Sequence, residues 1–297
     1  MGVRLVTGDI PRFWEAFGPG DDPEAPDTAA RRRLRQVYLE PGTVGLRALL
    51  PTGEEPAGAL LGALRAHRNY YASIRAESLH VLRTLPARLE EVLERLCELF
   101  PDLNTDLYLV MGALGRGGTL GREGRRRFAV VGLEFFCGGP HADTRSLSPW
   151  QRSVLHPADA LPGVVAHELI HTLQPEVRVE QLTLLQAVLA EGATEYLGRL
   201  ISGETINAQL HEYGLIHEGE LKRRLQADLD QGATLDGWLY QGERAGNEPA
   251  DLGYFLGSRI VQAYHERHRD RADVLHELLH FALRDPQGFT RLSGYFG

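Results

Sequence analysis

Hydrophobic positions in the first third of the chain repeat at helical intervals. Between residues 58 and 99, apolar residues recur every three or four positions, which places them on one face of an α-helix. The pattern predicts amphipathic helices with a break at Pro86 and an end near Pro101. We therefore expect residues 1–104 to form a mostly helical amino-terminal region.

The pattern then changes from helical to strand-like. Residues 106–111 (DLYLVM) and 127–136 (RFAVVGLEFF) are short apolar runs of the kind that form strands. Between them, residues 112–124 are rich in glycine and predict a long loop. This loop has no GxxxxGK[ST] pattern, so we do not expect it to bind phosphate.

Helical patterning returns in the rest of the chain. Ser148 followed by Pro149 is typical of a helix start, with a capping side chain and then proline at the first helical position. Breaks between helices are predicted near Pro175, Gly203, Gly232 and residues 246–249.

Composition narrows the classes of function. The chain has 297 residues, 43% of them hydrophobic and 24% charged, which is enough for a sizeable core. The net charge of −8 leaves no basic surplus to neutralise phosphates, so nucleic acid is not an expected partner. Cys97 and Cys137 are too few for a disulfide framework, and we expect buried thiols.

The sequence shows no membrane span and no secretion signal. The first ten residues lack an apolar stretch behind a basic head. A run of about 18 consecutive apolar residues, which a spanning helix needs, does not occur. The expectation for the chain as written is a cytoplasmic location, whereas a chain trimmed of a leader would be exported.

One short segment carries candidate chemistry: His167-Glu168-Leu169-Ile170-His171. Residues four apart lie on one face of a helix, so His167 and His171 present two imidazoles to one point, as zinc requires. Glu168 is rotated from His167 by about 100°, so its carboxylate can reach a water on the metal without binding the metal. These residues predict a catalytic Zn²⁺ site.

A second copy of the pattern, residues 276–280 (HELLH), shows that five residues alone do not decide the assignment. The first copy has a candidate third ligand, Glu191, twenty residues after His171 in a further predicted helix. Glu195 lies one turn beyond, placed to accept the second imidazole N–H of a ligand histidine. Gly192 would let this helix approach the first closely. The later copy has only 17 residues after it, so only an upstream residue could complete it, and we expect an ordinary amphipathic helix there.

HELIH followed by EGATE resembles the gluzincin zinc peptidases. A wider set of segments is similar to a bacterial family of predicted zinc-dependent proteases related to a gliding-motility lipoprotein: Gly117-Gly118-Thr119, VVGLEFF, HELIHTLQ, EGATEYL and GYFLG. The likeness covers residues 105–297 and, more weakly, the segment around Phe13-Trp14. It implies His167, His171 and Glu191 as zinc ligands and Glu168 as the general base.

Two departures from these relatives bear on the reaction. Ala190 stands where thermolysin-like enzymes have an asparagine, and the GAMEN motif with which the aminopeptidases bind a substrate amine is absent. An endopeptidase is therefore expected rather than an exopeptidase. The resemblance implies Tyr254, which begins the GYFLG helix, as the donor to the oxyanion, with His217, Tyr213 and Tyr240 as alternatives.

These observations predict an α+β, zincin-like fold with a small, partly antiparallel sheet packed on the active-site helix. Residues 1–104 form an amino-terminal helical region, 105–204 the core with the metal site, and 205–297 a helical region that completes the cleft. Residues 130–136 are the expected edge strand for a peptide or protein substrate. One alternative is a zinc hydrolase of a small non-peptide substrate. The other is a non-catalytic zinc-retaining scaffold, and the intact Glu168 disfavours this second alternative.

Overall fold

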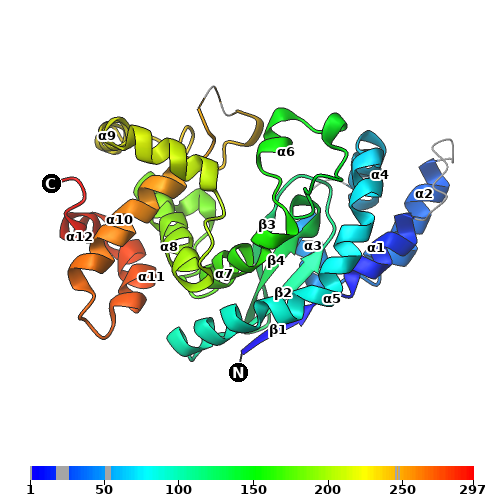
Figure 1. Ribbon diagram of the computed structural model, residues 1–297, viewed down its shortest axis with the longest axis horizontal. Helices are drawn as coiled ribbons and strands as arrows, with labels where there is room; N and C mark the ends of the chain where they lie inside the picture. The colour runs from blue at the N-terminus through cyan, green and yellow to red at the C-terminus, as the bar shows by residue number, and fades with distance from the viewer. Residues whose placement is uncertain (1, 18–26, 51–54, 245, 247) are drawn as a thin grey trace. The chain divides into compact units, whose positions relative to one another are not determined.

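The computed structural model describes residues 2–17, 27–50, 55–244, 246 and 248–297. Two compact units divide the chain, Met1–Thr172 and Leu173–Gly297. Most of the described chain is helical, and one small mixed sheet accompanies the helices (Figure 1). The predicted α+β class is therefore confirmed, while the organisation into three regions stays a prediction.

The first unit contains all four strands of the described chain. Its elements in chain order are β1 (Gly2–Val6), α1 (Asp9–Phe17), α2 (Asp27–Arg33), the π-helix η1 (Leu34–Leu39), α3 (Val44–Leu49), α4 (Pro56–Ala66), α5 (Arg68–Leu99), β2 (Asn104–Val110), β3 (Gly118–Glu123), β4 (Arg126–Gly132), the 3₁₀ turns η2 (Leu133–Phe135) and η3 (Thr144–Ser146), α6 (Pro149–Ser153), η4 (Ala158–Ala160) and α7 (Leu161–His171).

The sheet has the order β1-β2-β4-β3, in which β3 alone runs antiparallel to its neighbour. Helices cover both faces. A side chain at Gly45 of α3 would overlap Tyr108 of β2, so α3 lies close against the face that carries Tyr108. α7 lies on the other face, because Arg127 reaches it from β4. The sheet thus provides a rigid support for α7.

Two of the predicted element boundaries are wrong. The glycine-rich stretch 112–124 is not only a loop, because it contains β3, which pairs with β4 from Gly118↔Val131 to Glu123↔Arg126. Pro86 does not end a helix, because α5 continues through it. The buried face of α5 runs on without interruption through Leu85 and Leu89, and this packing offsets the hydrogen bond that proline cannot donate.

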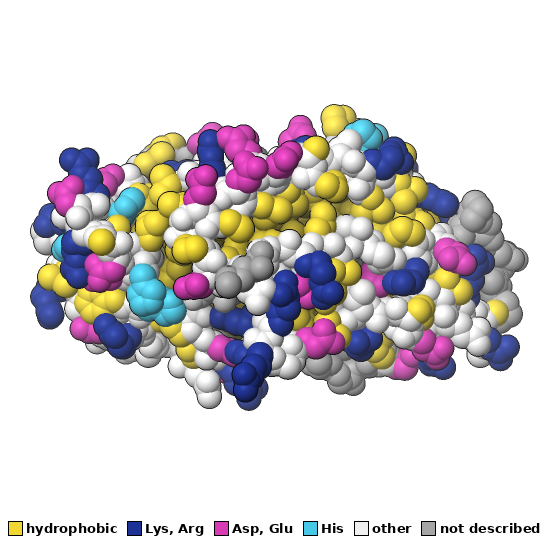
Figure 2. Space-filling model, turned by 90° about the horizontal axis from the view of Figure 1, so that it is seen from below, with side chains coloured by type: hydrophobic (Ala, Val, Ile, Leu, Met, Phe, Trp, Pro, Cys, Tyr) yellow, Lys and Arg dark blue, Asp and Glu magenta, His cyan; other side chains and the backbone are white. Residues whose placement is uncertain are grey.

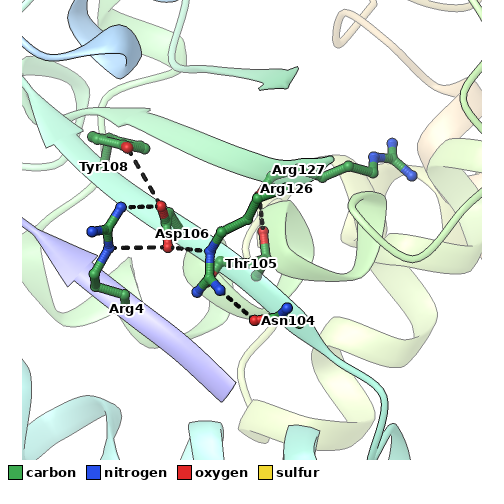
Figure 3. A network of polar contacts seen from close by, with 7 residues as sticks. All are labelled: Arg4, Asn104, Thr105, Asp106, Tyr108, Arg126 and Arg127. Atoms are coloured by element: carbon green, nitrogen blue, oxygen red, sulfur yellow. Dashed lines mark hydrogen bonds and ion pairs between the residues drawn. The ribbon is translucent and has the colours of Figure 1, made fainter. Parts of the chain in front are cut away.

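A network of charges ties the strands together at the start of the sheet (Figure 3). Asp106 of β2 is buried and forms ion pairs with Arg4 of β1 and Arg126 of β4. Burial raises the pKa of Asp106, but the hydrogen bonds from Arg4 and Arg126 outweigh it and hold the pKa below its ordinary value. Arg127 points away from this network (Figure 3).

The second unit is helical throughout its described residues. Its elements are η5 (Val179–Gln181), α8 (Leu184–Ser202), α9 (Ala208–Asp230), η6 (Gly242–Arg244), α10 (Gly253–His268), α11 (Val274–Arg284) and α12 (Pro286–Ser293). α8 starts at a capping box formed by Thr183 and Gln186, and it ends at Gly203, whose φ of +77° is left-handed.

α8 and α10 pack closely at a pair of glycines. A side chain at Gly192 of α8 would overlap the backbone of Gly257 in α10, and one at Gly257 would overlap the backbone at Val188. Gly192 was expected to let α8 approach the HELIH helix. The contact that requires glycine here is instead the one with α10, where the two backbones touch.

Charges of both signs share the face of the molecule drawn in Figure 2. Acidic side chains gather along part of its margin, and arginine or lysine side chains lie between other acidic ones, with hydrophobic side chains between them. Within the described residues, we find no helix that combines the length and the apolar character needed to cross a bilayer.

Candidate metal centre

α7 presents two histidines to one point. His167 and His171 are one turn apart, and their Nε2 atoms lie 3.1 Å from each other. The two rings are steeply inclined at 76° rather than stacked. Two nitrogens on one tetrahedral zinc, each about 2.0–2.1 Å from the metal, lie about 3.3 Å apart. This pair therefore fits a zinc ion bound by both rings.

Glu168 follows His167 and lies against the sheet. Its half-buried carboxylate occupies the space that a side chain at Gly118 would fill. A side chain at position 118 would therefore have to displace the Glu168 carboxylate from this place. Since Gly118 is the first residue of β3, the carboxylate lies at the start of the edge strand.

Arg127 holds the carboxyl end of α7 on the sheet. Its guanidinium donates a hydrogen bond of 3.2 Å to the backbone carbonyl oxygen of His171. A cation at this end of a helix is favoured by the helix dipole. Because Arg127 belongs to β4, the last turn of α7, which carries His171, is fixed to the central part of the sheet.

In the second unit, Glu191 of α8 is nearly buried, with 6% of its surface exposed. The hydroxyl of Tyr240 donates a hydrogen bond of 2.5 Å to Glu191 Oε1. Tyr240 has a φ of +56°, a backbone conformation that side chains with a Cβ atom rarely adopt. The contact therefore depends on a loop that holds Tyr240 in an unfavourable conformation.

Reciprocal hydrogen bonds hold that loop. The Gln241 N–H donates to the Asp251 carboxylate at 2.8 Å, and the Asp251 N–H donates to the Gln241 side-chain oxygen at 2.7 Å. Arg244 donates to the carbonyl oxygen of Tyr240 at 3.0 Å. These bonds fix the backbone on the carboxyl side of Tyr240.

Glu195 is buried one turn beyond Glu191. Its Oε1 lies 2.9 Å from Nε2 of His211, and Asn207 donates to its Oε2 at 3.4 Å. These partners belong to the same unit and hold the carboxylate in place. The expected hydrogen bond from a ligand histidine to Glu195 stays a prediction.

One group of side chains among the described residues could hold a metal ion with three ligands. His167, His171 and Glu191 each offer one ligand atom, and these atoms lie within 4.8 Å of one another. Two imidazoles and one carboxylate are a donor set that zinc accepts in catalytic sites. The three residues are those that the sequence predicts as ligands.

The second HExxH copy has a different geometry. His276 and His280 of α11 stack face to face, with ring centroids 4.0 Å apart and planes inclined at only 19°. Glu277 accepts a hydrogen bond from Tyr264 and forms an ion pair with Arg271. In the described part of the chain this copy belongs to no three-ligand group.

The candidate oxyanion donors lie in different places. Tyr254 is half-buried in the first turn of α10. Tyr213 stacks on His217, and its hydroxyl donates to Glu248 at 3.2 Å. Tyr240 donates to Glu191. The contact between Tyr240 and the candidate ligand is not apparent in the sequence, because the two residues are 49 positions apart and no helical or strand spacing connects them.

The predicted substrate strand needs a correction. Residues 130–136 were expected to form an edge strand, but β4 ends at Gly132 and lies between β2 and β3. Both of its sides are therefore occupied by neighbouring strands. The edge next to α7 is β3, in the stretch that was expected to be a loop.

A helix-borne HExxH pair in an α+β fold, with a nearby glutamate, defines a candidate zinc hydrolase. Residues 87–279, more than half of the chain, match the model of a family described as "Predicted Zn-dependent protease (DUF2268)". The protein belongs to this family. No curated protein and no solved structure matches the chain.

Proposed function

We propose that this protein is a zinc-dependent peptidase of the gluzincin type with a zincin-like fold, in which His167, His171 and Glu191 bind Zn²⁺. The approach of the two histidine Nε2 atoms to 3.1 Å carries the proposal. The inclusion of Glu191 in the same three-ligand group supports it. Three protein ligands leave a fourth zinc position for water or substrate, as in catalytic rather than structural sites.

The Glu168 carboxylate is the proposed general base. A bound zinc ion would lower the pKa of a water and polarise the scissile carbonyl. With the metal bound, Glu168 would accept the proton of the attacking water and donate it to the leaving amine nitrogen. Its place beside Gly118, on the face of the sheet that carries α7, supports this role, because it directs a proton acceptor to the edge of the sheet.

β3 is the proposed substrate-binding strand. It stands at the end of the four-strand order, so an extended peptide can pair with its outer edge. A peptide on this edge would pass Gly118 and therefore the Glu168 carboxylate. The edge strand favours a peptide over a small non-peptide substrate. Because an interior stretch of a peptide can pair with β3, the arrangement suits an endopeptidase.

We assign a different role to each of three further polar side chains. Tyr240 orients Glu191, because its one hydroxyl proton is donated to that carboxylate. Tyr254 is the proposed donor to the oxyanion. Glu195 is the proposed acceptor for the second N–H of a ligand histidine.

Replacing Glu168 tests the proposal. Glu168→Gln should retain zinc but lower peptide hydrolysis by about 10²–10⁴-fold, since an amide cannot accept the proton of the water. Zinc content is measured by mass spectrometry of the purified protein, and hydrolysis with a library of quenched fluorescent peptides, with and without a chelator.

Glu277→Gln is the matched control, because it makes the same change in the second HExxH copy. It should leave zinc content and hydrolysis unchanged, although it weakens the contacts with Tyr264 and Arg271. Full activity in Glu168→Gln, or loss of zinc in Glu277→Gln, would contradict the assignment.

A further inference from the structure

A buried carboxyl group lies at the end of β4, outside the candidate metal centre. Glu134 belongs to η2, and none of its surface is exposed. The backbone N–H groups of Gly112 and Leu114 donate to its carboxylate at 2.8 and 3.4 Å. No ion pair to Glu134 occurs among the described residues. Its partners are thus main-chain groups of one loop, residues 111–117.

This loop has the features of a segment shaped around the carboxylate. A Cβ atom at Gly112 would lie 2.6 Å from Glu134 Oε1, so a side chain at this position would disturb the carboxylate in its present place. Leu114 has a φ of +57°, in the left-handed region. A non-glycine residue keeps this conformation only where its surroundings impose it.

Tyrosines hold the first part of the loop. The hydroxyl of Tyr71 donates to the Gly112 carbonyl oxygen at 2.8 Å, and that of Tyr38 donates to the Met111 carbonyl oxygen at 2.5 Å. The later part borders a cavity of about 160 Å³ lined by Leu49, Ala113, Gly115, Arg116 and Glu134. Packing is therefore incomplete in the part of the loop that approaches β3.

The loop leads directly to the general base. The Gly132 N–H donates to the Gly117 carbonyl oxygen at 2.8 Å, and β3 begins at the next residue. Gly118 is the residue against which the Glu168 carboxylate lies. The path from Glu134 to Glu168 thus consists of six backbone residues, 112–117, and one glycine contact.

We propose that Glu134 is a positioning residue for Glu168, which it serves by fixing the loop 111–117 and thereby the first residue of β3. The proposal rests on the proposed peptidase function for its activity readout. It does not depend on that function for the loop itself, which can be measured directly.

The electrostatic surroundings agree with this role. Burial raises the pKa of Glu134 from its ordinary value of 4.5 to about 7, against the hydrogen bonds from Gly112 and Leu114. The titratable and charged groups that face it are Tyr70 and Tyr71 of α5, Tyr38 of η1, Cys137 beyond η2 and Arg116 of the loop. The carboxylate is thus kept buried at a cost in stability near neutral pH, which a residue with only a packing role would not need.

Glu134→Gln is the test. An amide of the same size can accept one of the two N–H bonds but presents an NH₂ group to the other. Hydrogen exchange at residues 112–120 should accelerate about tenfold or more. Peptide turnover (kcat) should fall by a similar factor, while KM and zinc content stay near the wild-type values.

A pH series tests whether Glu134 is buried as an ionisable group. A buried acid with a raised pKa contributes its stability below the unfolded pKa, near 4.5, and loses it as the pH rises through about 7. Relative to Glu134→Gln, the urea concentration at which half of the wild type is unfolded should therefore decrease as the pH rises from about 4.5 to about 7. Asp106→Asn is the control, since it removes a buried carboxylate from β2, away from the loop 111–117. Exchange at residues 112–120 and kcat should stay as in the wild type.

Wild-type exchange at residues 112–120 in Glu134→Gln would overturn the proposal, and so would accelerated exchange with unchanged kcat. If Glu134→Gln does not fold, Gly112→Ala decides, because its methyl group would meet Glu134 Oε1 and disturb the contact between the carboxylate and the loop. This variant should reproduce both effects, and their absence would refute the role. If the wild type cleaves no peptide, the proposed function fails, whereas the exchange comparison still tells whether Glu134 holds the loop.

Discussion

Tyr240 reaches Glu191 from a backbone conformation that costs about 1–3 kcal/mol for a residue with a Cβ atom. The paired hydrogen bonds between Gln241 and Asp251 and the bond from Arg244 offset this cost locally. The loop thus holds the tyrosine hydroxyl at the Glu191 carboxylate.

Tyr240→Phe should weaken zinc binding about 10–100-fold, because Glu191 then loses the hydrogen bond that orients it. A competition titration with a chelating dye gives the dissociation constant. Tyr213→Phe serves as the control, since its hydroxyl donates to Glu248 instead. Equal zinc affinity in Tyr240→Phe and the wild type would show that Glu191 needs no such support.

Among the elements, the contact of α8 with α10 is the most sensitive to side-chain size. Gly192→Ala places a methyl group on the backbone of Gly257, and the helices can accommodate it only by moving apart. We expect a loss of about 1–3 kcal/mol in the free energy of unfolding, measured by urea denaturation.

Gly219→Ala in α9 makes the same change in an open helical position. The added atom would meet only the end of the Arg223 side chain, at 3.7 Å. This variant should be stabilised by about 0.5–1 kcal/mol, because alanine favours the helix more than glycine does. If both variants lose the same free energy of unfolding, the loss comes from the substitution within each helix and not from the contact between α8 and α10.

Sequence patterns correctly predicted the helix ends that are marked by local residues such as caps, proline and glycine. Ser148 and Pro149 start α6 as expected, and Gly203 follows the end of α8. β3 was missed because three of its six residues are glycine or arginine, so it lacks the apolar alternation of a strand and exists through pairing with β4. The continuation of α5 through Pro86 likewise depends on tertiary packing.

In the candidate site, too, local spacing predicted some residues, whereas other contacts depend on the fold. His167, Glu168 and His171 follow from helical spacing, and Glu191 from a plausible distance along the chain. The contacts of Gly118 with Glu168 and of Tyr240 with Glu191 join residues 50 and 49 positions apart. Such contacts are set by the fold, which a single sequence does not reveal.

At the scale of the whole molecule, zinc bound by the proposed ligands His167, His171 and Glu191 should stabilise the folded chain. At a free zinc concentration about 1,000 times the dissociation constant, the gain is about 4 kcal/mol. Removing the metal should lower the unfolding temperature on the order of 10 °C, measured by calorimetry with and without a chelator.

Re-addition of zinc should restore the original temperature, and Glu191→Ala should reduce the difference between the two forms. If the chelator leaves the wild-type unfolding temperature unchanged, the protein does not use zinc as a ligand of its folded state.

An edge strand that is open to a substrate is also open to another copy of the chain. β3 (GTLGRE) has two glycines and ends in Arg122 and Glu123, and such residues disfavour a stable sheet between two copies of the chain. The same weakness suits turnover, because a strand that paired tightly would retain its cleaved product. On the proposed function, the low β-propensity that hid this strand in the sequence would therefore limit pairing with a second copy of the chain and favour release of the product.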